Sequence, residues 1–524
     1  MEKSKNKELI LYRLISLMFF GLFLSISALM LILNPLINYA TKKTFLFSNM
    51  TLLLLDLLAF FLILLAWKKL KPRFSERLDH HADKVILIAS IILLCLQLYI
   101  SYHTYFATGW DVGSYVIPAA KLIASGSSLE SVNSYFSIYP NNITLVWIFS
   151  ELFKFKSSIP FLATSNDLVI IIALNCLIST LTGILTYKCV KRLTNVRWAV
   201  FSWLLYVLLI GLSPWMVITY SDALSLFFPI LIFYIYTSEF SPKLFPLKWL
   251  LIGMLSFIGF YIRPQVVIML IAIVIIEGWK GIFVNLKGKM KFMAVLAILV
   301  VSFSLSGTIK QGIIRDAGFE TNEEDVLGWT HFAMMGLNDA RDGIYSSEDA
   351  VFSDSFETVE ERKAANLEEI KDRLDSFGLS GYLNFLSRKA LVNYGDGTFA
   401  WSVEGGFYME TYEDKDPLIS PRLKSFYYFG EKNYGITSTV EHAIWVLTIL
   451  SLLGLAFMGK TKLDPRLSVL MLSLIGLTMF ELIFEARARY LYIYAPIYLV
   501  LGAVGLKSIL QRMRQGKIKA FSSI

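Results

Sequence analysis

Long apolar runs separated by short polar segments dominate the chain. A helix that crosses a bilayer needs about 20 mostly apolar residues. Twelve runs approach or exceed this length, at 10–33, 49–67, 84–102, 167–187, 198–218, 222–239, 247–262, 264–278, 290–307, 438–458, 466–484 and 490–507. The pattern predicts an all-α polytopic membrane protein with about 12 transmembrane helices. The first run is too long for a signal peptide and lacks a small-residue cleavage site, so we expect it to be retained.

The composition excludes a soluble protein. Of 524 residues, 56% are hydrophobic and 17% are charged, against about 25% charged residues in soluble proteins. The three cysteines lie in or at the ends of apolar runs. A disulfide framework or a cysteine-based zinc site is therefore not expected.

The positive charges are distributed unevenly between alternate loops. With the N-terminus inside, the cytoplasmic loops hold 28 Lys and Arg and the short external segments hold 8. Such a bias predicts a cell-membrane protein with both termini in the cytoplasm. The net charge of +8 combines this basic rim with an acidic segment, 309–436, whose net charge is −11. Contact with anionic lipids explains the basic loops, and nucleic-acid binding is not predicted.

These features divide the chain into three parts. Residues 1–308 form a transmembrane module whose external loop, 103–166, is the candidate catalytic loop. Residues 309–436 form an acidic extracytoplasmic domain of mixed or α structure, and 437–524 supply the C-terminal transmembrane helices and a basic cytoplasmic tail. Within 309–436, helical spacing is interrupted by glycines at 378 and 395.

The loop 103–166 contains two apolar stretches that are short for a span, 113–125 and 141–156. Counting 141–156 as a span would move the basic segment 188–197 outside and break the charge bias. We therefore expect both stretches to be interfacial helices. A re-entrant hairpin remains the alternative for 141–156.

Four external turns carry charged residues although such turns are otherwise poor in charge. Their sequences are Trp110-Asp111, Tyr220-Ser221-Asp222, Arg263-Pro264 and Glu485-Ala486-Arg487-Ala488-Arg489-Tyr490. The aspartates could cap helices, Arg263 could snorkel, and Arg487 and Arg489 could bind lipid headgroups. The recurrence of charge on one face favours a shared functional site.

A carboxylate and several arginines at a membrane surface suit glycosyl transfer from a lipid carrier. Guanidinium groups pair with phosphate through two hydrogen bonds, and a carboxylate can take the proton from an acceptor hydroxyl. Attack at the anomeric carbon would release a polyprenyl phosphate with one more negative charge, which the arginines would stabilise. We expect Asp111 to be the general base and Asp222 to support it. Arg263, Arg487, Arg489 and Tyr490 would bind the donor phosphate, with Trp110, Tyr220 and Glu485 contacting substrate.

The layout resembles the GT-C superfamily of membrane glycosyltransferases, and in particular family-39-like enzymes such as protein O-mannosyltransferases and aminoarabinose transferases. Asp111 in GWDVGSY matches the acidic residue of the first external loop, and the segment YPNN, Tyr139 to Asn142, resembles a Pro-containing segment later in that loop. The resemblance implies a GT-C-like fold and roles for Tyr139, Asn141 and Asn142 in substrate binding. It implies hexosyl or pentosyl transfer from a polyprenyl-phosphate sugar to a cell-envelope glycan or a lipid-linked acceptor. Val112 stands where protein O-mannosyltransferases have Glu, which argues against a protein acceptor.

Two other classes of function stay open. A transporter or flippase of a lipid-linked or anionic substrate would give a use to Asp56, which lies in the middle of a predicted helix; a protonated or paired core residue is the alternative for Asp56. A non-catalytic envelope assembly protein would use 309–436 as its interaction surface. No cofactor is expected, although two external aspartates could hold a divalent metal.

Overall fold

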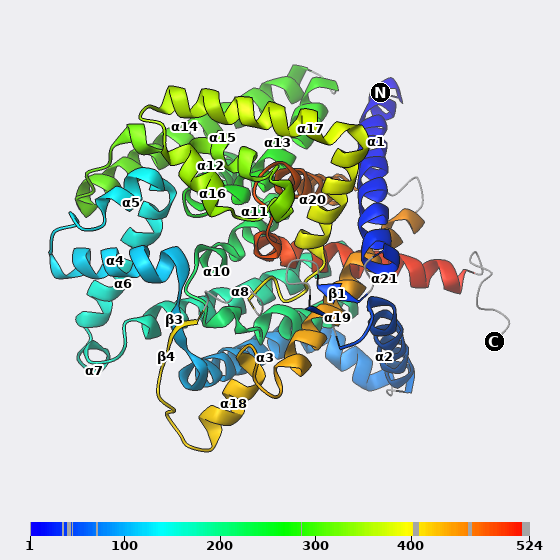
Figure 1. The fold of residues 1–524 in the computed structure, drawn as a ribbon. Coiled ribbons are helices and arrows are strands. Elements are labelled where there is room, and N and C mark those ends of the chain that lie inside the picture. Colours follow the sequence, from blue (N-terminus) through cyan, green and yellow to red (C-terminus); the bar gives the residue numbers. More distant parts are fainter. Residues whose placement is uncertain are drawn as a thin grey trace.

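The computed structural model describes residues 2–33, 36–38, 43–44, 46–69, 72–283, 286–401, 408–458 and 464–515. The described chain is almost entirely helical, with two short antiparallel sheets (Figure 1). Nine helical stretches within it are long and apolar enough to cross a membrane. They are built on α1 (Glu2–Ala28), α3 (Pro72–Thr104), α8 (Leu168–Leu193), α12 (Phe245–Ile262), α13 (Val267–Phe283), α14 (Leu286–Ala317), α19 (Tyr434–Leu452), α20 (Pro465–Ile483) and α21 (Ala495–Arg514).

The other three predicted spans are also helical but shorter as apolar helices. They correspond to α2 (Asn49–Lys69), to α9 (Val196–Tyr206) with the π-helical turn η4 (Val207–Gly211), and to α10 (Ser221–Ser225) with α11 (Phe227–Thr237). The predicted helix 198–218 is too long at its C-terminal end. It stops at Gly211 because Pro214, which opens the 3-10 turn η5 (Pro214–Met216), has no N–H to continue the helix.

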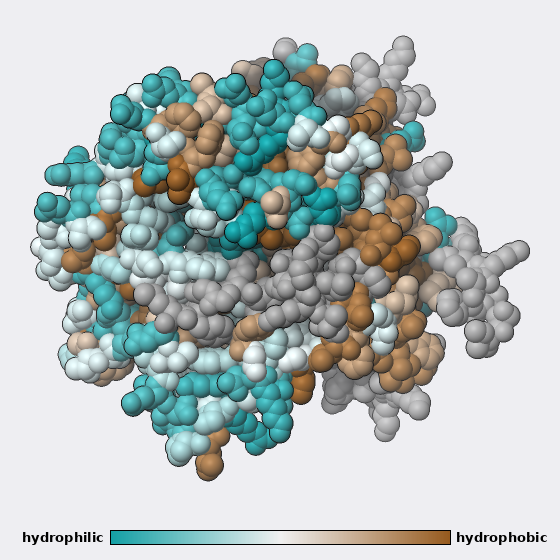
Figure 2. Space-filling view, viewed as in Figure 1, coloured by the Kyte–Doolittle hydropathy of each residue, from teal (hydrophilic) through white to brown (hydrophobic). Residues whose placement is uncertain are grey.

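The outer surface of several helices is apolar, as a bilayer requires. Leu17 of α1, Ile92 of α3 and Val300 of α14 are 69%, 62% and 65% exposed. Figure 2 shows hydrophobic residues gathered on the side of α1 and α2, and hydrophilic residues over α15 to α17 and α18. Exposed aliphatic side chains in such number would be unfavourable in water, so these surfaces face lipid. The all-α polytopic class predicted from the sequence is confirmed.

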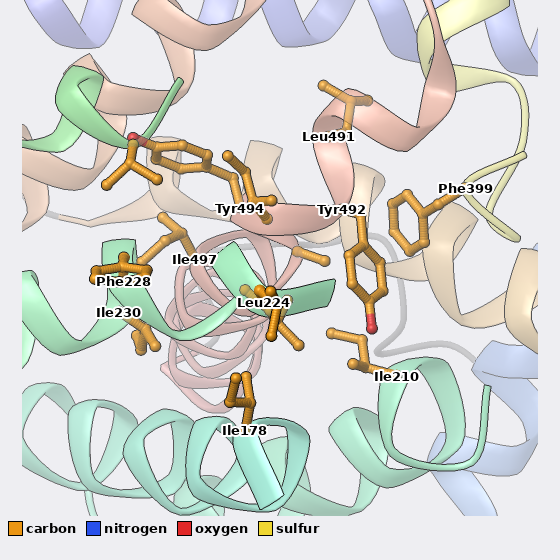
Figure 3. Close-up of a cluster of buried hydrophobic side chains, with 14 of the residues drawn as sticks. Ile178, Ile210, Leu224, Phe228, Ile230, Phe399, Leu491, Tyr492, Tyr494 and Ile497 are labelled. Carbon is orange, nitrogen blue, oxygen red and sulfur yellow. The ribbon is translucent and has the colours of Figure 1, made fainter. Parts of the chain in front are cut away.

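One part of the core surrounds the 3-10 segment η12 (Ala488–Tyr494), which leads into α21. Its side chains pack against α8, η4, α10 and α11 (Figure 3). The buried cluster includes Ile178, Ile210, Leu224, Phe228, Ile230, Phe399, Leu491, Tyr492, Tyr494 and Ile497. This packing fixes the backbone that follows Arg489.

The first loop, 103–166, contains several short helices. A π-helical turn, η2 (Val112–Val116), leads into α4 (Ile117–Ser125), which packs against α6 (Ile143–Ser157). These helices confirm the helical structure predicted at 113–125 and 141–156. Three shorter elements, α5 (Asn133–Ile138), η3 (Pro140–Asn142) and α7 (Pro160–Ala163), complete the loop.

The acidic segment, 309–436, contains α15 (Gly328–Met335), α16 (Ser347–Asp354), α17 (Val359–Tyr394) and α18 (Ile419–Tyr427), and α14 extends into it as far as Ala317. Both predicted glycine breaks in this segment are confirmed. Gly378 interrupts α17 with a φ of 57°, and Gly395 follows its last residue. The positive φ favours glycine because a side chain would clash there.

Several contacts hold the acidic segment against the rest of the molecule. Strand β4 (Tyr408–Thr411) pairs with β3 (Phe106–Thr108), which ends three residues before Asp111. The other sheet pairs β1 (Ile37–Asn38) with β2 (Lys43–Thr44). The fully buried Lys389 of α17 donates to the carbonyl oxygens of Gly336, 2.5 Å away, and Leu482, 3.0 Å away. Gly336 itself touches the end of α20, since a Cβ there would lie 2.5 Å from the oxygen of Ile483. Helix α15 is therefore fixed beside the turn that carries Glu485.

Candidate active site

A cavity of about 600 Å³ lies between the first loop, the turn after α12, the segment before η12, and α15. Eleven of the twelve residues predicted for the site line it. They are Trp110, Asp111, Tyr139, Asn141, Asn142, Tyr220, Arg263, Glu485, Arg487, Arg489 and Tyr490. Residues more than 370 positions apart in the sequence thus share one cavity of a size suited to a small substrate.

Asp111 stands at the start of the helical turn that leads into η2, but it makes no side-chain capping hydrogen bond. The Asp111 side chain therefore does not cap this helical turn, which was the alternative considered from the sequence. Instead the hydroxyl of Tyr220 donates to Oδ2 of Asp111 over 3.4 Å. The preceding residue, Trp110, has a φ of 57°, an unfavourable value for a bulky side chain that is typical of functional sites.

Asp222 is the one predicted site residue that does not line the cavity. It is fully buried in α10, behind the cavity wall. Its Oδ1 lies 2.9 Å from Nη2 of Arg263, and its Oδ2 lies 3.3 Å from Nη1 of Arg489. One carboxylate is thus shared by two guanidinium groups.

The three arginines are fixed by aromatic rings as well as by acids. The guanidinium carbon of Arg489 lies 4.6 Å from the ring centre of Tyr220 and 4.9 Å from that of Tyr490. Arg263 lies 4.6 Å from the ring centre of Tyr490, and Arg487 lies 5.0 Å from that of Trp110. Cation–π contacts of this kind hold a guanidinium without neutralising it.

Glu485 occupies the centre of a small hydrogen-bond network. It accepts from Nε of Arg487 over 2.9 Å and from the hydroxyl of Tyr490 over 3.0 Å. The side chains of Arg487 and Arg489 are only 14% and 8% exposed. They line the cavity and are mostly withdrawn from the surface, which disfavours the lipid-headgroup alternative.

Stacked tyrosines form another wall. Tyr115 and Tyr135 are parallel, with ring centres 4.0 Å apart and an interplanar angle of 2°. Asn142 donates to the hydroxyl of Tyr135 over 2.7 Å, which gives a structural reason for the asparagine of the YPNN segment. Burial raises the pKa of Tyr135, and the charge of Asp111 raises it further. Burial likewise raises the pKa of Tyr139 and Tyr220. These phenols therefore stay protonated and can serve as hydrogen-bond partners.

The acidic segment contributes His331, Phe332, Met335 and Tyr345 to the cavity. Nδ1 of the fully buried His331 lies 2.8 Å from Oγ of Ser353, and that hydroxyl donates to Oδ1 of Asn366 over 3.0 Å. Because the Ser353 proton is used in this way, His331 must donate through Nδ1, which leaves a lone pair on Nε2. Among the described residues, Nε2 has no hydrogen-bond partner. Burial lowers the pKa of His331 to about 4, so the ring is neutral at physiological pH.

The sequence matches one protein-family model over residues 3–509, that of a "Conserved hypothetical integral membrane protein" family. The chain belongs to this family. No curated protein matches it significantly. Among solved structures, it is similar to an archaeal oligosaccharyltransferase, AglB from Archaeoglobus fulgidus, in complex with an inhibitory peptide and a dolichol-phosphate. The identity is 12% and the TM-score is 0.36, with 83% of this chain and 52% of that chain covered. The chain thus spans about half the length of that protein.

Family membership and the lipid-facing surfaces establish an integral membrane protein. Within the described residues, no group of three or more His, Cys, Asp or Glu side chains is arranged to hold a metal ion. The two aspartates considered from the sequence as metal ligands are placed differently. Asp111 lines the cavity, whereas both oxygens of Asp222 contact guanidinium groups.

Sequence reasoning missed His331, Tyr115, Tyr135 and Tyr345. Tyr115 lies in the GWDVGSY segment, four positions after Asp111, and could have been found from that spacing. The other three reach the cavity through tertiary packing. Asp56, in α2, is not among the residues that line the cavity, and its Oδ2 is buried without a hydrogen-bond partner among the described residues.

Proposed function

We propose that the protein is a glycosyltransferase that moves a sugar from a polyprenyl-phosphate donor to a cell-envelope glycan or lipid-linked acceptor at the outer face of the membrane. The observation that carries the proposal is the position of Tyr220. Its hydroxyl contacts the Asp111 carboxylate, and its ring contacts the Arg489 guanidinium. A base and an anion-binding group are thus neighbours in one cavity.

In the proposed reaction, Asp111 takes the proton from the acceptor hydroxyl as its oxygen attacks the anomeric carbon of the donor sugar. The bond between that carbon and the phosphate oxygen breaks, and its electrons go to the polyprenyl phosphate. The leaving phosphate gains one negative charge, which the mostly buried side chains of Arg263, Arg487 and Arg489 stabilise. A positioned base contributes about 10²- to 10⁴-fold to such a step.

The surrounding residues support binding and orientation. The stacked Tyr115 and Tyr135 offer an aromatic surface for a sugar ring. Asp222 is assigned a positioning role, because it contacts two arginines and does not reach the cavity. Both the base and the arginines lie at helix ends, which favours transfer at the surface over transport through the midplane.

The decisive experiment uses purified full-length protein and a panel of polyprenyl-phosphate sugars, with released polyprenyl phosphate as the readout. Asp111→Asn keeps the size of the side chain and removes its basicity, so turnover should fall by about 10²-fold or more. Donor binding and thermal stability should stay close to wild type. Glu130→Gln, an exposed acid of the same loop, is the matched control and should have wild-type turnover. Wild-type turnover of Asp111→Asn would overturn the assignment of the base.

A further inference from the structure

A second cavity, of about 910 Å³, lies at the opposite ends of α12 and α13 from the candidate active site. Arg263 stands between the C-terminus of α12 and the start of α13, whereas Lys248 lies in the first turn of α12 and Lys280 in the last turn of α13. An 18-residue helix is about 27 Å long at about 1.5 Å per residue. Both helices belong to candidate spans, so the two cavities lie on opposite faces of the membrane.

The walls of this cavity change from apolar to basic between floor and rim. Trp249 and Val295, which line it, are 5% and 3% exposed. Lys280 and Arg466 at the rim have side chains that are 26% and 40% exposed. A floor of aromatic and aliphatic groups beneath a cationic rim matches a molecule with an apolar body and an anionic head.

Part of the charge in this cavity is already neutralised by protein groups. Glu277 accepts from the Tyr236 hydroxyl and from Nζ of Lys280, each over 2.6 Å. Arg466 pairs with Asp464 over 2.5 Å. Glu239, which is exposed, also lines the cavity. The lining cations that remain are Lys248 and Lys291.

Lys248 and Lys291 line the same cavity without a carboxylate partner. Nζ of the part-buried Lys248 donates to the main-chain oxygens of Tyr236, 2.6 Å away, and Ser238, 2.9 Å away. Lys291 lies over the ring of Phe245, 5.0 Å from its centre. Neither lysine has a carboxylate oxygen within 4.0 Å among the described residues. Lys291 is exposed, and Lys248 is part-buried with main-chain oxygens as its hydrogen-bond acceptors. Both ammonium groups can therefore pair with an anion from outside the chain.

We propose that this cavity binds the phosphate headgroup of an anionic glycerophospholipid from the adjoining leaflet. The phosphate contacts Lys248 and Lys291, and the glycerol and first acyl carbons pack against Phe245 and Trp249. A lipid fits better than a soluble anion because the cavity opens at the ends of membrane-spanning helices and has an apolar floor. The charge bias of the loops predicts that this face is cytoplasmic, where anionic lipids are concentrated.

The test measures binding to delipidated full-length protein in neutral detergent, by native mass spectrometry and thermal stabilisation. The probes are short-chain phosphatidylglycerol, short-chain phosphatidylcholine, farnesyl phosphate and inorganic phosphate. Phosphatidylglycerol should bind and stabilise, and Lys291→Gln should weaken it by about fivefold, because one basic residue near a lipid headgroup is worth about 1 kcal/mol. The same probe should bind Lys289→Gln as it binds wild type, since Lys289 is exposed on the same helix and does not line the cavity.

Lys248→Gln should weaken binding by a similar factor, and Lys291→Gln keeps the test valid if Lys248→Gln fails to fold. Equal binding of phosphatidylglycerol to Lys291→Gln and wild type would overturn the proposal. So would equal stabilisation by phosphatidylcholine or by inorganic phosphate, because each would identify a different ligand. Stabilisation by farnesyl phosphate counts against the proposal only if Lys291→Gln reduces it, because the candidate active site is itself proposed to bind a polyprenyl phosphate. The measurement involves no sugar transfer, so its outcome is independent of the proposed function.

Discussion

At the scale of single residues, His331 makes the clearest link between the acidic segment and the cavity. Its Nδ1 is committed to Ser353, and burial lowers its pKa to about 4, whereas an unfolded histidine has an ordinary value of 6.5. Between these two values the unfolded chain binds a proton that the folded protein does not. Folding stability should therefore fall as the pH is lowered from about 6.5 to 4, by up to about 3 kcal/mol from this residue.

Comparison of wild type with His331→Asn tests this pH dependence. Asn can still donate to Ser353 from the position of Nδ1, but it does not titrate in this range. Wild type should lose more thermal stability than His331→Asn between pH 7 and pH 4.5. His80→Asn, at an exposed position of α3, should follow wild type. If the wild-type and His331→Asn curves run parallel, the histidine is not held neutral by burial.

The residues that sequence analysis predicted share a visible signal, which is charge in an external turn of a hydrophobic chain. Asp111, Arg263 and Arg489 stand out in this way. His331 and Tyr135 do not, because histidine and tyrosine are ordinary within a polar helix and an aromatic-rich loop. The sequence pattern also could not predict the direction of a side chain. Asp222 precedes the apolar helix α11, as a capping residue would, but its side chain points to two arginines behind the cavity.

At the scale of elements, Asp222 joins three pieces of the structure. It lies on α10 and pairs with Arg263 in the turn between α12 and α13, and with Arg489 on η12. Asp222→Asn should leave two buried guanidinium groups with no shared counterion. Breaking a buried pair of this kind costs about 3–5 kcal/mol. The variant should unfold at a clearly lower temperature and bind the polyprenyl-phosphate donor more weakly.

Asp316→Asn is the matched control for Asp222→Asn, because Asp316 and its partner Arg315 are 68% and 84% exposed. An exposed pair is worth about 0–1 kcal/mol, so its loss should hardly change the unfolding temperature. Similar temperature shifts for the two variants would contradict the buried, shared role of Asp222.

Helix existence was easier to predict than helix ends. Apolar length alone located a helix at each of the twelve predicted positions, nine of which are candidate spans within the described residues. The end of η4 at Gly211 instead depends on Pro214. The break between α10 and α11 lies one turn before Pro229, which has no N–H to bond the carbonyl of Ser225. The pairing of β3 with β4 could not be predicted from either segment. It joins residues about 300 positions apart and is set by packing of the acidic segment on the first loop.

At the scale of the whole molecule, the orientation in the membrane decides on which face each of the two cavities opens. The arginine cluster and the lysine-lined cavity lie at opposite ends of α12 and α13. If the loops follow the charge bias, the candidate active site faces outward, where no nucleotide sugar is present and a lipid-linked donor is required. The reverse orientation would place the same site in the cytoplasm and remove the reason for a lipid carrier.

Cysteine labelling in intact cells decides between these orientations. Single cysteines at Lys188 and Ser355, both exposed, are introduced into a variant that lacks Cys95, Cys176 and Cys189. A membrane-impermeant maleimide should label position 355 in intact cells and position 188 only after permeabilisation, because 188–197 is predicted to be cytoplasmic and 309–436 to be extracytoplasmic. Equal labelling of both positions after permeabilisation controls for accessibility. Labelling of position 188 in intact cells would invert the topology, and with it the face on which sugar transfer is proposed to occur.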